Sequence, residues 1–193
     1  MSKDRLLAFS DGVIAILITI MVLELKVPHG SDWSSLSPLV PIFFTYILSY
    51  VYLGIYWNNH HHMFQITHRI NGQILWANLH LLFWLSLVPF VTGWMGENHF
   101  TALPTAAYGV VMAGAGLAYT ILQSTILKEE GPTSELGKAV QNDVKGKLSL
   151  ALYILAIPLA FVNQLISDAI FVTVALIWLI PDPRIERRIK HSE

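Results

Sequence analysis

A serine–aspartate pair at the start of a long apolar stretch is the group in this sequence best placed to do chemistry. Ser10 and Asp11 follow Phe9, and residues 13–23 are apolar apart from Thr19. A carboxylate inside a membrane is costly unless it is paired, and such groups commonly bind ions, carry protons or hold partners. We therefore expect Asp11 either to have a buried donor or to act directly on an ion or proton.

Donors suited to this pair occur near the start of another apolar segment, residues 74–94. They are Trp76, Asn78 and His80. Their N–H groups can satisfy a serine and a carboxylate, and both segments are expected to begin on the same side of a membrane. The alternative is an ordinary polar cluster at the membrane interface. Arg5 is expected at that interface too, where an acid or a lipid phosphate can pair with it.

The apolar residues after the pair form a stripe of their own. Ile16, Ile20 and Leu23 recur at helical spacing, with Thr19 beside them. At about 100° per residue, Asp11 points about 140° away from Ile16. The stripe either contacts lipid or other helices, or it serves a function separate from that of Asp11.

The histidines at 60–62, with His68, suggest a metal site at first sight. Consecutive histidines cannot share one helix face, and no Asp or Glu occurs from residue 52 to residue 80, so a complete ligand set is lacking. We therefore interpret this run as a polar cytoplasmic loop and expect no metal.

Composition indicates a membrane protein. The chain has 193 residues, of which 54% are hydrophobic and 13% charged, against about 25% charged in soluble domains. Its net charge is −1 and it has no cysteine, so we expect no nucleic-acid partner and no disulfide or thiolate site. Motifs of metalloproteases, nucleotide-binding enzymes and hydrolases are absent. We therefore expect a protein that is not an enzyme and needs no cofactor.

Six segments approach the length of about 20 apolar residues that a membrane-spanning helix needs. They cover residues 6–27, 39–57, 74–94, 102–127, 148–166 and 169–180. The sixth is the shortest, because Pro181 ends it. We expect one all-α integral membrane domain over residues 1–193.

Orientation follows from the basic residues. With the N-terminus in the cytoplasm, 11 of the 12 Lys and Arg residues fall inside and only Lys26 lies outside, as the positive-inside rule requires. Both termini are therefore expected to be cytoplasmic.

The same residues resemble the transmembrane protein 175 family of potassium channels. The resemblance starts with Arg5, the triplet at 9–11, Ile16 and Thr19, and it continues through residues 56–60 and 78–90. One six-helix unit per chain is similar to the prokaryotic branch of the family. The potassium-channel motif T-V-G-Y-G, which builds a carbonyl selectivity filter, is missing.

The resemblance implies a homotetramer in the bacterial inner membrane, with potassium as the permeant ion and the first helix lining a central pore. It implies a weak to moderate preference for potassium over sodium. The constriction would fall on Ile16, with Ile20 and Leu23 as further apolar rings and Thr19 hydroxyls nearby. The implied residues that brace this helix are Arg5, Phe9, Ser10, Asp11, Trp76, Asn78 and His80.

Two alternatives stay open. One is a membrane scaffold or enzyme subunit, which no catalytic motif supports, and the other is proton transport. Asp11 and His80 are titratable groups that a proton channel or a proton-coupled transporter would use as a relay. Transporters of this kind commonly carry repeats or broken helices, and neither is evident in the sequence.

Overall fold

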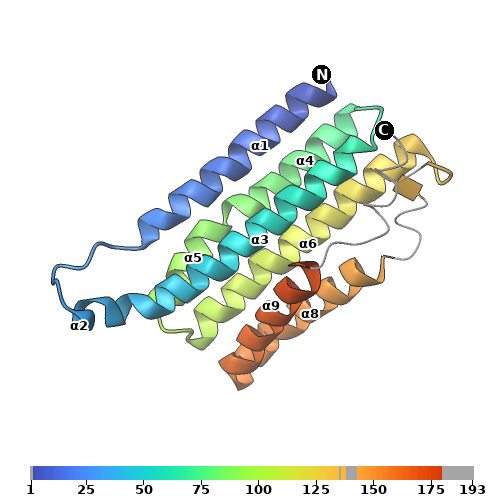
Figure 1. The fold of residues 1–193 in the computed structure, drawn as a ribbon. Coiled ribbons are helices and arrows are strands. Elements are labelled where there is room, and N and C mark those ends of the chain that lie inside the picture. Colours follow the sequence, from blue (N-terminus) through green and yellow to red (C-terminus); the bar gives the residue numbers. More distant parts are fainter. Residues whose placement is uncertain (1, 135, 138–142, 180–193) are drawn as a thin grey trace.

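All regular elements of the computed structural model, which describes residues 2–134, 136–137 and 143–179, are helices (Figure 1). In chain order they are α1 (Lys3–Ile20), η1 (Met21–Glu24), α2 (Trp33–Leu36), η2 (Ser37–Leu39), α3 (Val40–Gln65), α4 (Gly72–Ser86), α5 (Val88–Glu97), α6 (Ala102–Glu130), α8 (Val144–Val162) and α9 (Gln164–Leu179), where η denotes a 3₁₀ turn. The α1 helix lies along one edge of the bundle, and the α8–α9 hairpin lies along the opposite edge.

Five helical segments are long and apolar enough to cross a membrane. They are Lys3–Glu24, Trp33–Gln65, Gly72–Glu97, Ala102–Glu130 and Val144–Val162. The α9 helix adds a shorter apolar segment of 16 residues. The expected all-α membrane fold with six apolar helical segments is therefore confirmed. The predicted end of the sixth segment and the basic tail after it lie outside the described residues.

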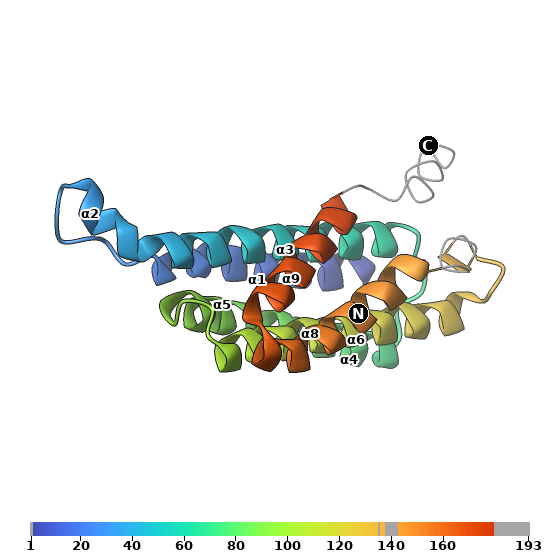
Figure 2. The same cartoon turned by 90° about the horizontal axis from the view of Figure 1, so that it is seen from below.

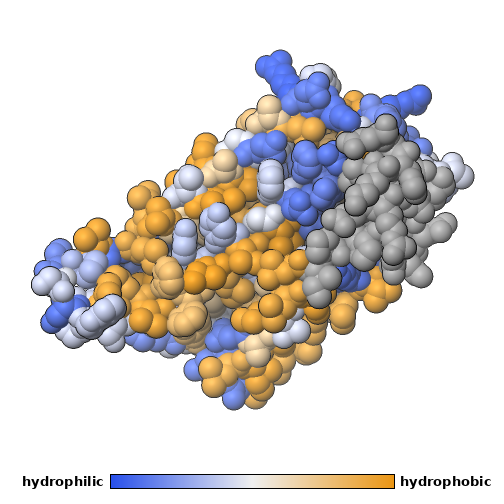
Figure 3. All heavy atoms as spheres, in the orientation of Figure 1, coloured by the Kyte–Doolittle hydropathy of each residue, from blue (hydrophilic) through white to orange (hydrophobic). Residues whose placement is uncertain are grey.

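Two layers of helices organise the bundle. In the second view, α1 and α3 lie in one layer and α4, α5 and α6 in the other, with the α8–α9 hairpin beside them (Figure 2). Apolar residues cover most of the middle of the face in Figure 3, and hydrophilic residues gather toward its ends. This distribution suits a bundle that meets lipid hydrocarbon along its sides and water at its ends.

The predicted fifth and sixth segments, 148–166 and 169–180, begin later than the observed α8 (Val144–Val162) and α9 (Gln164–Leu179), because Asn163 alone separates the two helices. Three further differences follow. The helix expected to end at residue 57 continues to Gln65, because polar residues without Gly or Pro do not end a helix. The histidines at 60–62 are therefore helical, and the predicted loop is wrong. The first helix tightens into η1 and ends at Glu24 rather than at residue 27, since Pro28 keeps the preceding residue extended.

The third difference is a break in the helix predicted for 74–94. It divides into α4 and α5 at Leu87. Pro89 explains the break, because it has no N–H to donate and its ring clashes with the carbonyl four residues earlier. The two pieces together still form one apolar span, Gly72–Glu97.

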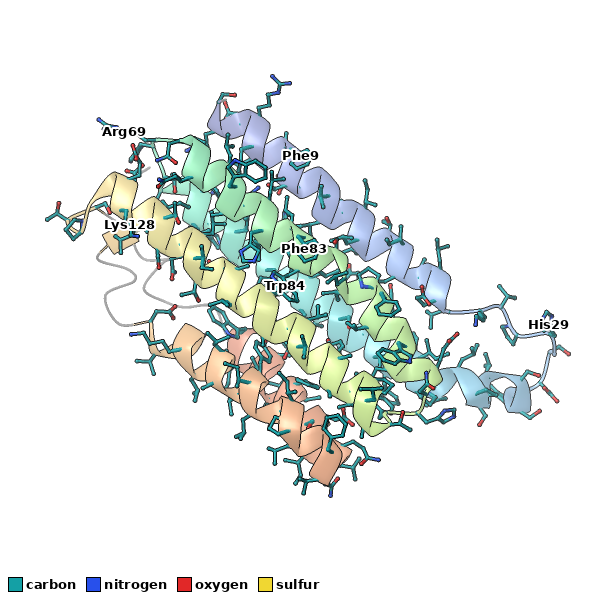
Figure 4. All side chains as sticks on the ribbon, turned by 180° about the vertical axis from the view of Figure 1, so that it is seen from behind. Phe9, His29, Arg69, Phe83, Trp84 and Lys128 are labelled. Atoms are coloured by element: carbon teal, nitrogen blue, oxygen red, sulfur yellow. The ribbon has the colours of Figure 1, made fainter. Side chains whose placement is uncertain are left out.

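The α4 and α6 helices are in close contact at a glycine. Gly114 of α6 lies under the Trp84 ring, and a Cβ at this glycine would be 2.4 Å from two of the ring carbons. Figure 4 shows Trp84 between these two helices. A glycine is required here because an indole is rigid and cannot withdraw one end.

Gly114→Ala is expected to destabilise the bundle by about 1–3 kcal/mol, the usual cost of overpacking a core. Gly116→Ala is the matched control, because its new Cβ would meet neighbours only at 3.7 Å or more, and both changes gain the same helix propensity. The fraction that stays monodisperse in detergent after heating measures the effect. Equal melting of the two variants would contradict the close packing of Trp84 on Gly114.

Candidate functional site

The α1 helix has one buried face and an opposite face that nothing in the subunit covers. The buried residues are Leu6, Ser10, Ile14 and Leu17 of α1, followed by Met21 of η1. They recur at helical spacing and pack against α3 and α4. At about 100° per residue, the exposed face is centred about 155° away from this buried face.

The exposed face carries the predicted apolar stripe. Ile16 is 59% exposed, Ile20 39% and Leu23 74%. Leu23 belongs to η1, and side chains three residues apart in a 3₁₀ turn lie directly above one another. The tightened turn therefore keeps Leu23 in line with Ile20, so the stripe continues past the end of the α-helix.

Thr19 lies on the same exposed face as Ile16. Its hydroxyl donates to the Ile16 carbonyl at 2.9 Å. The donor is therefore used within the helix, and the oxygen lone pairs of Thr19 are what this residue offers to an ion or water.

Asp11 has a tryptophan donor, and that donor comes from α3. Trp57 Nε1–H donates to Asp11 Oδ1 at 3.0 Å. Trp76, the donor suggested by the sequence, lies on α4 with 75% of its surface exposed. The structure thus places Trp57 where Trp76 was expected.

Ser10 belongs to a fully buried chain of hydrogen bonds that joins three helices. Its hydroxyl donates to the Leu6 carbonyl at 3.0 Å and accepts from Asn78 Nδ2 at 2.9 Å. The other side of the amide, Asn78 Oδ1, lies 2.7 Å from His60 Nε2. Because Oδ1 can only accept, His60 donates from Nε2, and the chain runs from α3 through α4 to α1.

The remaining nitrogen of His60 is an open end of this chain. Nδ1 is buried and lacks a hydrogen-bond partner among the described residues. A neutral imidazole with the proton on Nε2 leaves only a lone pair there, whereas a protonated ring would bury an unpaired N–H. The geometry therefore favours the neutral tautomer.

The other predicted members of the bracing set lie elsewhere. His80 Nε2 accepts from Trp84 of its own helix at 3.0 Å. Phe9 is 51% exposed and projects from α1 (Figure 4), and Arg5 is exposed. The structure brings together Ser10 with Asn78, and it does not bring His80 to Asp11.

Sequence reasoning missed three residues that hold α1. It assigned no role to Trp57 in holding α1, and it placed His60 in a loop. Lys3, the third, donates from Nζ to the Thr67 carbonyl at 3.1 Å, which ties the start of α1 to the residues after α3. The missing signal was the continuation of α3, which places Trp57 and His60 on one face at i and i+3.

The residues that follow α1 and η1 are held by an ion pair. Lys26 donates to Glu97 Oε1 at the end of α5. This hydrogen bond and the charge of Glu97 raise the pKa of the exposed Lys26 ammonium above its ordinary value. Lys26 therefore stays protonated, and the link persists, throughout the physiological pH range.

The fold and the site define an all-α membrane protein whose first helix exposes an apolar face on one side and is held on the other by a polar anchor, the hydrogen bonds of Ser10 with Asn78 and of Asp11 with Trp57. No cluster of metal-binding side chains occurs among the described residues. Comparisons with known proteins place the chain more closely.

The family model described as "Endosomal/lysosomal potassium channel TMEM175" matches residues 5–89. A potassium channel of Chryseobacterium sp. (strain P1-3) is 54% identical over 192 residues, covering 100% of both chains. A potassium channel of Chamaesiphon minutus is 31% identical over 186 residues, covering 89% of this chain and 91% of the relative. The crystal structure of a lysosomal potassium-selective channel TMEM175 homolog from that organism matches with a TM-score of 0.81 and 25% identity, over 92% of this chain and 96% of that one.

The chain belongs to the TMEM175 family. It is a prokaryotic TMEM175-family channel and not an enzyme, as the residues at 9–11 and their surroundings indicated.

Trp57→Phe is expected to destabilise the protein by about 1 kcal/mol, because it removes one hydrogen bond to a carboxylate at a half-exposed site. Trp76→Phe deletes the same ring atoms at an exposed position and is expected to leave stability unchanged. Melting temperature in detergent measures both variants. A greater loss for Trp76→Phe would show that the tryptophan of α4 holds Asp11 instead.

Proposed function

We propose that this chain forms a potassium-permeable homotetramer in which α1 of each subunit lines a central pore. The observation that carries the proposal is the exposed stripe of Ile16, Ile20 and Leu23, directed away from the buried face of α1. Support comes from the relatives, which are named potassium channels. Potassium is the permeant ion, and the channel uses no bound cofactor.

Symmetry converts the stripe into rings. Closed rotational symmetry places the same residue of each subunit at the same depth, so Ile16 side chains form the narrowest ring and those of Ile20 and Leu23 form further ones. An apolar constriction of this kind gates by losing its water. Potassium gives up its hydration water more easily than sodium does, which supports a weak to moderate preference for potassium.

The polar anchor has a supporting role in this proposal. Ser10 and Asp11 face helices of their own subunit, whereas Ile16 faces away from them. The hydrogen bonds of the pair fix the rotation of α1 about its axis, and this rotation aims Ile16 at the pore.

The arrangement favours potassium permeation over the proton relay. A relay through Asp11 and His80 needs the two residues to exchange a proton directly or through water. Asp11 is bonded to Trp57 of α3, and His80 to Trp84 of α4. Proton transport that depends on both residues remains the alternative, and potassium flux in the absence of a pH gradient distinguishes the two.

Both termini are proposed to lie in the cytoplasm, in the inner membrane of a bacterium. Arg69 and Lys128 lie at the same end of the bundle, and His29 lies at the opposite end (Figure 4). Lys3 joins the first group through its bond to Thr67. Basic residues concentrated at one end support this orientation.

Ile16→Asn is expected to raise potassium flux several-fold in liposomes and to lower the preference for potassium over sodium, because a polar side chain wets the constriction. Ile154→Asn is the matched control, since Ile154 of α8 is similarly exposed at 55% and lies across the bundle from α1. Potassium flux in Ile16→Asn equal to that of the wild type would remove Ile16 from the constriction.

Asp11→Ala is expected to lower the yield of assembled tetramer, while the tetramers that do form keep the wild-type ion preference. Removing the carboxylate leaves the Trp57 N–H without its partner, which costs about 1–3 kcal/mol where the group is buried and less here. Native mass spectrometry gives the oligomeric state, with Asp4→Ala on the exposed first turn of α1 as control. Wild-type yield with altered ion preference would instead place Asp11 in the permeation path, and a stable wild-type monomer would exclude a central pore.

A further inference from the structure

A second site of interest lies on the side of the bundle away from α1. A partly open cavity lies among α3, α6 and the α8–α9 hairpin. The described residues that line it are Tyr52, Ile55, Tyr56, Asn59, Gly116, Tyr119, Thr120, Asp143, Gly146, Ser149, Leu150, Tyr153 and Trp178. None belongs to α1, so the cavity is independent of the proposed pore.

Aromatic rings form much of the wall. Tyr56 packs edge-on against Tyr119 with centroids 6.2 Å apart, and Tyr52 packs edge-on against Tyr153 at 6.0 Å. In an edge-to-face pair the two ring faces do not cover each other, and ring faces are electron-rich. Gly116 helps to keep the space open, because the Tyr56 hydroxyl oxygen lies 3.8 Å from the position of a Cβ there.

Most hydrogen-bond donors of the wall are used within the protein. Asn59 Nδ2 donates to the Ile55 carbonyl. The Thr120 hydroxyl donates to the backbone carbonyl of Gly116, and the Ser149 hydroxyl donates to the backbone carbonyl of Lys145. The Tyr52 hydroxyl donates to the Phe171 carbonyl, and the Tyr119 hydroxyl to that of Asn59. Trp178 Nε1–H donates to Ser149 Oγ at 2.8 Å. The lining also carries oxygen acceptors, among them the side-chain carbonyl of Asn59 and the carboxylate of Asp143.

The charges of the lining residues also favour a cation. Asp143 contributes the one acidic group among the described lining residues, and no basic side chain is among them. Lys145 lies beside the wall, with its ammonium 5.4 Å from the centroid of the Trp178 ring. This contact shows that the aromatic groups here already attract an ammonium, as cation–π interactions require.

We propose that this cavity binds a small organic ammonium group. Aromatic rings, oxygen acceptors and one carboxylate complement such a cation, whereas the carboxylate would repel an anion. A weakly hydrated organic cation gains more from aromatic faces than a strongly hydrated inorganic one. The ligand is either a soluble amine or the ethanolamine headgroup of a lipid, because both carry the same group.

Choline is the probe, and its neutral isostere 3,3-dimethyl-1-butanol is the reference compound. Saturation-transfer NMR on the purified full-length protein in detergent is expected to show saturable choline binding and no saturable binding of the alcohol. Asp143→Asn is the first variant: its amide oxygen can still accept from the Gly146 N–H, as Asp143 Oδ1 does at 2.8 Å, but the charge is gone. Choline affinity is expected to fall about fivefold or more.

A pair of variants separates the ring from the hydroxyl. Tyr56→Phe keeps the aromatic face and is expected to bind choline within about twofold of wild type, whereas Tyr56→Leu loses about fivefold or more. Elution volume and melting temperature check that each variant is folded. If Tyr56→Leu does not fold, Asp143→Asn and the neutral isostere decide the question alone.

Three results would overturn the proposal. The first is equal binding of choline and the neutral isostere, and the second is wild-type choline affinity in Asp143→Asn. The third is displacement of choline by potassium chloride but not by lithium chloride at the same ionic strength, which would assign an inorganic cation site.

Choline binding in nanodiscs of different lipids then identifies the source of the ligand. Weaker choline binding in phosphatidylethanolamine than in phosphatidylglycerol supports a lipid headgroup, and equal binding with displacement by ethylammonium supports a soluble amine.

Discussion

The hydrogen bonds that Ser10 and Asp11 make with α3 and α4 are the constraint on which the rest of this structure depends. Lipid tails are as apolar as isoleucine, so a helix in a bilayer gains little from burying one apolar face rather than another. The residues of α1 after Gly12 are apolar on nearly every side. Its rotation must therefore be set by polar contacts, and the buried chain from His60 through Asn78 to Ser10 does this.

The strength of this constraint comes from its burial. Ser10, Asn78 and His60 are within 2% of complete burial, so breaking one bond leaves a partner unsatisfied at a cost of about 1–3 kcal/mol. Rotating α1 by one residue would break the Ser10 and Asp11 contacts together. A polar network hidden on one side thus determines which apolar side chains appear on the other, and those apolar side chains meet the ions in the proposed pore.

The sequence was sufficient for the membrane class, the six apolar segments and the separation of Asp11 from the Ile16 stripe. These features depend on composition and on local helical spacing, which a single chain displays directly. The donor to Asp11 was harder to predict from the sequence, because Trp57 and Trp76 are the same residue type near the same membrane boundary. Choosing between them requires the packing of α3 against α1, contacts that join residues 46 positions apart. His60 was missed since a polar run without a helix breaker was interpreted as a loop.

One turn of α3 connects the anchor with the aromatic cavity. Trp57 and His60 face the α1 side of this turn, while Tyr56 and Asn59 face the cavity. Each pair is spaced i and i+3, and the two pairs are offset by one residue, so they occupy adjacent faces of the same turn. A ligand that displaced Tyr56 could not move this turn without moving the donors that hold Asp11 and Asn78. The aromatic cavity and α1 therefore share one rigid element, this turn of α3.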